Sequence, residues 1–198
     1  MLFPDIDFSH LKAVNPRTLG WIRLKNSLLD YPVVEGNGDF YLTHNFSDEP
    51  SPHGCIYASF DSTFPGSRCC LYGHNMKDGT MFTALIFYYY QEGYFASHKK
   101  IELLTENALY TISVFAAIQF PDDCAFMQFV PETQEPFSAW KEAVLKLSPF
   151  SAEFDLHVTD SIVSLVTCRR MDVHPTPGNL LVVGKLEAKC PRPYSFLS

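Results

Sequence analysis

Short apolar runs recur along the whole chain, each bounded by Gly, Pro, Asn or Asp. Several runs are rich in β-branched or aromatic residues, a composition that favours strands. The runs lie at 19–24, 54–58, 69–72, 101–104, 109–120, 162–167 and 180–186. Strands at this spacing are typical of a closed or nearly closed barrel, so the pattern predicts a mainly β fold with seven or eight strands.

Three segments show helical features instead. From Trp140, apolar residues recur at i, i+3, i+4 and i+7, which predicts a helix over 138–147. Ser138 is its expected N-cap, and Pro149 lies just beyond its end. Further helices are expected at 81–90 and 8–14. The tail at 191–194 contains two prolines, which lack backbone donors, so it is not expected to continue a central strand.

Length and composition fit one compact domain spanning residues 1–198. The chain has 198 residues, of which 46% are hydrophobic, and it shows no repeat or linker. Its formal charge of −7 argues against a nucleic-acid partner, which normally requires a basic face. No run of about 18 apolar residues predicts a membrane span, and residues 1–5 lack the features of a signal peptide.

The cysteines do not form a recognisable scaffold or metal site. Six are too few for a disulfide framework in a chain of this size, and no Cys-x-x-Cys occurs. Cys69 and Cys70 are adjacent within an apolar run, so we expect one thiol on each face of a strand. Buried structural thiols are the expectation for every cysteine except Cys168.

Two strand ends carry residues suited to acyl-transfer chemistry. The apolar run at 162–167 leads directly into Cys168, and His74 follows another strand, with Gly73 permitting the turn. Cysteine attacks as a thiolate, and histidine can take up or supply the proton near neutral pH. With seven histidines and six cysteines, many such pairs are conceivable, so residue types alone do not single this one out.

Longer segments supply a more specific signal. They are NPRTLGWI (15–22), DYPVV (30–34), FYLTH (40–44), GCIY (54–57), YGHNMKDGTMF (72–82), YFASHKKI (94–101) and LVTC (165–168). In this order they resemble class B sortases, the cell-surface cysteine transpeptidases of Gram-positive bacteria. The resemblance covers roughly residues 8–187.

The resemblance implies a sortase-like eight-stranded β-barrel with flanking helices, in which the helix at 138–147 lies between strands six and seven. It also implies that Cys168 attacks the carbonyl of a sorting-signal residue, usually Thr, and forms a thioacyl enzyme. His74 would protonate the leaving amine and then deprotonate an incoming amine from the cell wall or a pilin lysine. Tyr72 and Asn75 would line the substrate groove. No metal or organic cofactor is implied.

The chain departs from the family pattern at two positions. Aligning 181–186 with the family strand places Leu180 where a substrate-binding arginine is expected, and Val166 replaces a serine two residues before the cysteine. If the strand extends past Cys168, alternation puts Arg170 on the same face, roughly 7 Å away. Alternatively, the long loop at 169–179 delivers an arginine from a turn, or both of its arginines are solvated loop charges.

Three functional hypotheses follow. The first is a sortase that joins a surface protein or pilin to a cell-wall or pilin amine. The second is a degenerate sortase with weak or no turnover, acting as a peptide-binding or assembly module, because Leu180 and Val166 make the site more apolar. The third is a cysteine peptidase with water as its only acceptor. We expect a monomer at the extracellular face of the cell membrane, held by an N-terminal anchor that is absent from this chain.

Overall fold

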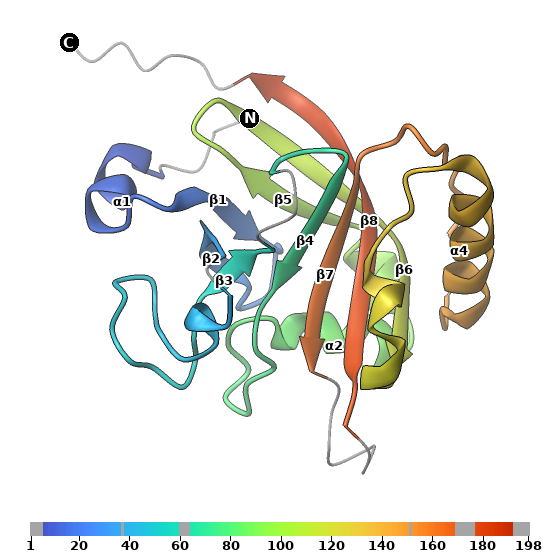
Figure 1. The fold of residues 1–198 in the computed structure, drawn as a ribbon, viewed down its shortest axis with the longest axis horizontal. Helices are drawn as coiled ribbons and strands as arrows, with labels where there is room; N and C mark the ends of the chain where they lie inside the picture. The colour runs from blue at the N-terminus through green and yellow to red at the C-terminus, as the bar shows by residue number, and fades with distance from the viewer. Residues whose placement is uncertain (1–5, 37, 60–63, 151, 169–176, 192–198) are drawn as a thin grey trace.

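The protein forms a closed eight-stranded barrel with helices around it (Figure 1). The computed structural model describes residues 6–36, 38–59, 64–150, 152–168 and 177–191. Strand order around the barrel is β1-β2-β3-β4-β7-β8-β6-β5, and β5 pairs with β1 to close it. The predicted mainly β class and the barrel with flanking helices are confirmed.

The strands are β1 (Thr18–Arg23), β2 (Asp30–Glu35), β3 (Ile56–Ala58), β4 (Arg68–Tyr72), β5 (Lys100–Leu104), β6 (Ala108–Phe120), β7 (Ile162–Cys168) and β8 (Asn179–Pro191). The α-helices are α1 (Phe8–Val14), α2 (Thr83–Tyr90), α3 (Tyr94–Ser97) and α4 (Gln134–Leu147). Two 3₁₀ segments, η1 (Phe40–Leu42) and η2 (Asp122–Gln128), complete the described elements.

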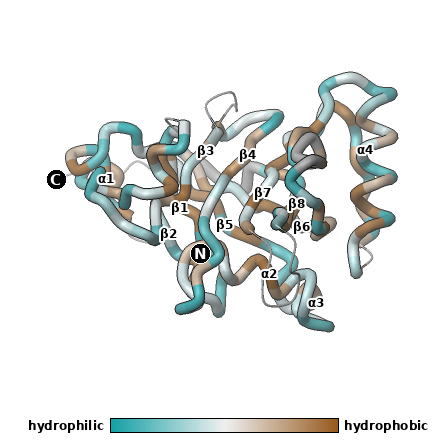
Figure 2. Tube along the Cα trace, turned by 60° about the horizontal axis from the view of Figure 1, so that its bottom comes forward, coloured by the Kyte–Doolittle hydropathy of each residue, from teal (hydrophilic) through white to brown (hydrophobic). Residues whose placement is uncertain are grey.

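Alternating residues of β4, β7 and β8 divide the apolar side chains between two cores. Val163, Leu165 and Val182 point into the barrel, whereas Val166 and Leu181 pack outside it, in the cluster that also holds residues of α4. Figure 2 shows the resulting hydrophobic stretches along these strands and along α4. A strand therefore has a buried side chain at nearly every position here, because each face is covered.

The parallel pairing of β4 with β7 sets the geometry of one barrel end. Tyr72 lies opposite Val166, and Cys70 lies opposite Ser164. Because the strands run in the same direction, both carboxyl ends emerge at the same edge. The segments that follow β4 and β7 therefore lie close together. Cys69 and Cys70 belong to the inner and outer clusters respectively, as their alternation predicted.

α4 confirms the predicted helix between strands six and seven but begins earlier than expected. Thr133 is its N-cap, and Ser138 lies inside the helix, where its hydroxyl donates to the carbonyl of Gln134. Pro136 is tolerated because the first four amides of a helix have no partner within it. α1 spans the predicted residues, and α2 lies within the predicted range.

Two strand expectations need correction. β2 was not predicted from the apolar pattern because Pro32 interrupts it, yet this residue pairs with Trp21. β8 continues to Pro191, which pairs with Ala108 of β6, so the proline does not end the strand early. The β7 pairing ends at Lys185, which leaves the last part of β8 bonded only to β6, where a missing donor costs less.

In the described part of the chain, no helix combines the length and apolar character that crossing a membrane requires.

Candidate active site

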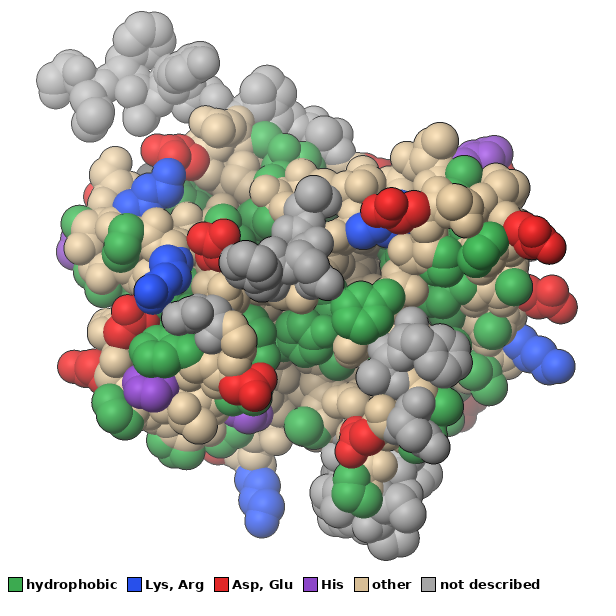
Figure 3. Space-filling model, in the orientation of Figure 1, with side chains coloured by type: hydrophobic (Ala, Val, Ile, Leu, Met, Phe, Trp, Pro, Cys, Tyr) green, Lys and Arg blue, Asp and Glu red, His purple; other side chains and the backbone are tan. Residues whose placement is uncertain are grey.

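Cys168 is the last residue of β7 and is exposed. Its position continues the series of β7 side chains that face outward, which includes Val166 two residues earlier. β7, which is paired with a strand on each side, thus ends in a thiol at the surface. Figure 3 shows this broad face of the molecule, where apolar side chains gather near the centre and carboxylates lie around them.

The loop after β4 is bonded directly to the end of β7. The Gly73 amide donates to the carbonyl of Val166 at 3.2 Å, and the Asn75 side-chain amide donates to the carbonyl of Cys168 at 3.1 Å. His74 lies between these two anchors. The structure therefore brings the predicted histidine and cysteine segments together, although Asn75 and Cys168 are 93 residues apart in sequence.

The same loop is closed on itself. The Phe82 amide donates to the carbonyl of His74 at 2.9 Å, and the Thr83 hydroxyl both accepts from the Met76 amide and donates to its carbonyl. Asp78 accepts from Thr80 and from His53, and both bonds hold its pKa at about 2. These bonds give the backbone around His74 a defined path.

The ring of His74 is half-buried and fixed by a main-chain partner. Its Nε2 lies 2.7 Å from the carbonyl oxygen of Leu42. A carbonyl only accepts, so Nε2 donates to it, and Nδ1 is the ring nitrogen that lies outside this bond. Gly54 lets this neighbouring loop approach, because a Cβ there would lie 2.3 Å from the Tyr41 carbonyl oxygen, and its φ is +62°.

The surroundings of Cys168 favour the protonated form of its thiol. Partial desolvation raises its pKa, and the nearby carboxylate of Asp122 raises it further. Asp122 begins η2, directly beyond the end of β6, and also accepts a hydrogen bond from the side chain of Asn179. A working nucleophile in this site must therefore lose its proton during the reaction.

Comparisons with known proteins bear on this arrangement. No family model matches the chain. It is 27% identical to sortase B of Listeria monocytogenes over 183 residues, covering 90% of this chain and 73% of that protein. It is 28% identical to sortase B of Staphylococcus aureus, covering 90% and 74%. The S. aureus sortase B–substrate complex superposes with a TM-score of 0.82 at 26% identity, covering 92% of this chain and 85% of that one.

These similarities support the assignment of the chain to the class B sortase family. Its similarity to sortase B supports a sortase function, within a family of cysteine transpeptidases. The helix α4 between β6 and β7 fits this assignment.

The residues predicted to line the substrate groove differ in how far they are exposed. Tyr72 is half-buried and stacks on Tyr57, with ring centroids 5.4 Å apart. Asn75 is half-buried and bonds to Cys168. Val166 faces the Cys168 side but is only 3% exposed, so it forms part of the floor and offers little contact surface. Their roles in substrate binding stay predictions.

The prediction that Leu180 lines the substrate groove was wrong. Its side chain is fully buried in the cluster inside the barrel, opposite Thr167, so it does not line the groove. The residue opposite Cys168 is Asn179. Adjacent residues of a strand point to opposite faces of the sheet, so Asn179 rather than Leu180 shares the face of Cys168. Arg170 lies outside the described residues.

Asn179 and Asp122 are the residues that sequence reasoning missed. Counting two-residue steps back from Leu181 in the apolar β8 run would have placed Asn179 on the outer face. Asp122 had no such signal, because it follows the barrel strand β6 and approaches Cys168 only through the tertiary fold. In the described part of the chain, no group of three or more metal-ligating side chains occurs.

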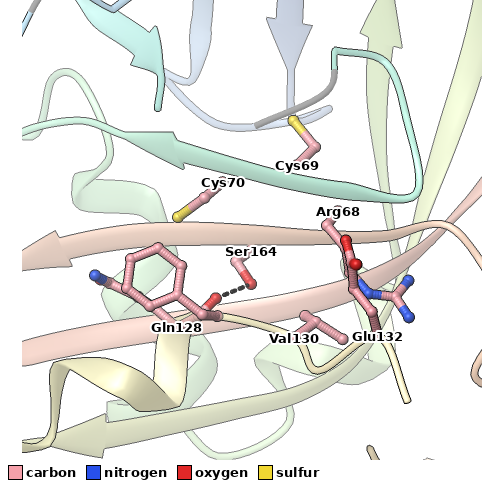
Figure 4. A pocket seen from close by; sticks show the side chains of 8 residues that line it. Arg68, Cys69, Cys70, Gln128, Val130, Glu132 and Ser164 are labelled. Atoms are coloured by element: carbon pink, nitrogen blue, oxygen red, sulfur yellow. Dashed lines mark hydrogen bonds between the residues drawn. The ribbon is translucent and has the colours of Figure 1, made fainter. Parts of the chain in front are cut away.

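A cavity of about 180 Å³ lies farther along the same outer surface (Figure 4). Cys69 and Cys70 of β4 and Ser164 of β7 are among the residues that line it, and the side chains of Cys69 and Cys70 point in different directions. The Ser164 hydroxyl donates to the carbonyl of Gln128 at 2.8 Å, which holds η2 against the strands. The cavity thus shares its strands with the surface that carries Cys168.

Proposed function

We propose that this sortase is a transpeptidase that cleaves a sorting signal after Thr and transfers the acyl group to an amine. The observation that carries the proposal is the joining of the His74 loop to the end of β7 by the bond from Asn75 to Cys168. Two segments with complementary acid–base and nucleophilic side chains meet there at the surface. Sortase B of S. aureus, which shares this fold, forms a complex with a substrate, and this supports the proposal.

We propose the following chemistry for these two groups. Nδ1 of His74 takes the thiol proton as the Cys168 sulfur attacks the Thr carbonyl, forming the S–C bond and a tetrahedral oxyanion. Collapse breaks the C–N bond, and His74 returns the proton to the leaving amine. An incoming amine then loses a proton to His74 and attacks the thioester; the C–S bond breaks, and His74 returns the proton to the Cys168 sulfur. The Leu42 carbonyl keeps Nε2 protonated throughout.

The acceptor and the setting form part of the same proposal. A peptidoglycan amine or a pilin lysine would supply the nucleophile, at the extracellular face of the cell membrane. Such a substrate is a flexible extended peptide. An open surface site, with Cys168 exposed at a strand end, suits that kind of ligand better than an enclosed cavity would.

Intact-protein mass spectrometry tests the proposal. The chain is incubated with a panel of sorting-signal peptides, with and without an amine acceptor. We expect a thioacyl adduct on Cys168, and a ligated product only when the amine is present. Cys168→Ala should give neither, whereas Cys124→Ala, at a half-buried cysteine of η2, should give both. Absence of any Cys168 adduct across the panel would contradict the proposal.

A second candidate is a peptide-binding module with little turnover. It is favoured by the carboxylate of Asp122, which raises the pKa of the Cys168 thiol. Under this candidate, labelled peptides bind equally to the native chain and to Cys168→Ala, and the native chain forms no product. Release of hydrolysed peptide without amine-dependent product would instead indicate a cysteine peptidase.

A further inference from the structure

Asn179 occupies a defined position beside Cys168. It begins β8 and pairs with Cys168 of β7 on one side and with Phe120 of β6 on the other. Directly opposed residues in a sheet point to the same face, with Cβ atoms about 4.5–5.5 Å apart. The side chain of Asn179 is half-buried, and it therefore stands next to the thiol on the outer surface.

Asp122 fixes the orientation of that side chain. The Asn179 Nδ2 donates to Oδ1 of Asp122 at 3.1 Å. A carboxylate only accepts, so the amide must turn its nitrogen toward Asp122. The amide nitrogen carries two N–H groups, and among the described residues Asp122 is the partner recorded for it. The other N–H is then available to an acceptor above the sheet.

We propose that Asn179 donates this N–H to the carbonyl oxygen of the acyl group carried by Cys168, with Asp122 as the positioning residue. The inference rests on the proposed function, because it names how the same site steadies the reacting carbonyl. A neutral amide would then supply the hydrogen bond that the resemblance led us to expect from an arginine. The site thereby gains a hydrogen-bond donor of fixed direction without a full positive charge.

The role of Asn179 is confined to the oxyanion. When the sulfur attacks, the S–C bond forms and the carbonyl π electrons move to oxygen, which the Asn179 N–H then stabilises. When the intermediate collapses, the electrons return and the leaving group departs. Asn179 gives up no proton in either step. Removing one such donor lowers kcat by about 10²–10³-fold in other acyl-transfer enzymes.

Two reactions of the same thiol separate this role from a structural one. p-Nitrophenyl acetate acylates a thiol through a tetrahedral oxyanion and needs no sorting-signal recognition. Iodoacetamide alkylates a thiol by direct displacement and forms no oxyanion. Both rates are measured at Cys168 by peptide-resolved mass spectrometry, for the native chain, Asn179→Ala, the larger apolar variant Asn179→Leu, and the control Asn107→Ala. Asn107 is exposed in the turn between β5 and β6.

We expect both Asn179 variants to lose at least 10-fold in acetylation rate, with alkylation within about twofold of the native chain. Asn107→Ala should match the native chain in both reactions. Unchanged acetylation in the Asn179 variants would overturn the inference, and so would an equal loss in both reactions. Failure of the sorting-signal reaction alone would count against the proposed function, because acetylation reports on Asn179 without that peptide.

Discussion

At the scale of single residues, Cys168 and His74 are held by main-chain contacts rather than by a bond between them. The Cys168 carbonyl accepts from Asn75, and the His74 ring donates to the Leu42 carbonyl. Burial raises the pKa of the Cys168 thiol, and the carboxylate of Asp122 raises it further. Main-chain contacts therefore fix the position of Cys168, while its surroundings oppose the ionisation of its thiol.

The pH dependence of Cys168 reactivity follows from the raised pKa of its thiol. Desolvation and Asp122 raise the pKa of the thiol, so the thiolate should form only above the pH at which an ordinary cysteine ionises. Asp122→Asn removes the negative charge and should shift the alkylation midpoint to lower pH. The measurement is the rate of Cys168 alkylation between pH 6 and pH 11. A midpoint that does not move in Asp122→Asn would show that desolvation alone sets the pKa.

Asn75 offers a second test at this scale. Asn75→Asp is nearly isosteric but cannot donate to the Cys168 carbonyl, so the loop that carries His74 should lose one anchor. A net hydrogen bond contributes about 0.5–1.5 kcal/mol, which corresponds to a loss of about 2–10-fold in acyl transfer. Steady-state kinetics with the acyl substrate measure it. Asn45→Asp, in the loop after η1, serves as a comparison for the added charge, and equal losses in both variants would count against this role.

At the scale of elements, most of the chain could be predicted because its strands carry strong apolar patterns. The seven predicted strands are present. Their ends differ from the prediction mainly where a polar residue next to the apolar run still pairs with the neighbouring strand. β2 was missed because Pro32 suppresses the strand signal, although its neighbours β1 and β3 supply the pairing. The start of α4 was placed late because a serine within a helix resembles a cap in sequence alone.

Arg68 connects elements that sequence patterns do not relate. Its guanidinium donates to the carbonyls of Ser67, Asp160, Pro131 and Val158, at 2.6–3.1 Å. It thus ties the start of β4 to the segments before α4 and before β7. The cavity on the outer surface is lined in part by this side chain.

We expect Arg68→Ala to lower the free energy of unfolding by about 2–4 kcal/mol, because several carbonyls lose a charged donor. Arg68→Lys should cost less, since an ammonium retains part of this bonding. Arg23→Ala is the control: it removes an ion pair with Asp30 at the surface and should cost under about 1 kcal/mol. Urea denaturation measures all three. Equal losses for Arg68→Ala and Arg23→Ala would refute the role of the four carbonyls.

At the scale of the whole molecule, side chains that point into the barrel and side chains that point out of it have different tasks. The inward ones stabilise the fold, and the outward ones form the candidate site. Residues of β7 and β8 that face inward fill the barrel, and their neighbours facing outward support the site and α4. The sequence could predict the apolar strands but not their register, because the β8 run is apolar on both faces. The relation of Asn179 to Cys168 is a property of the closed sheet and could not be read from either strand alone.

Leu180 and Asn179 provide a direct test of this separation. Leu180→Ala should lower the free energy of unfolding by about 2–5 kcal/mol, because it empties space inside the barrel, yet leave acyl transfer per folded molecule nearly unchanged. Asn179→Ala should lower acyl transfer per folded molecule, but it should lower the free energy of unfolding by less than about 1 kcal/mol. Urea denaturation and active-site titration report the two quantities. A large loss of acyl transfer in folded Leu180→Ala would contradict the separation.

The parallel pairing of β4 with β7 has a consequence for the order in which parts of the protein fold. All of β5, β6, η2 and α4 lie between these strands in sequence, so their contact closes a very long loop. Non-local parallel pairs of this kind form slowly. During synthesis from the N-terminus, the histidine loop emerges well before the cysteine strand exists. Cys168 and the His74 loop are therefore separate through most of folding, and they come together only as the barrel closes.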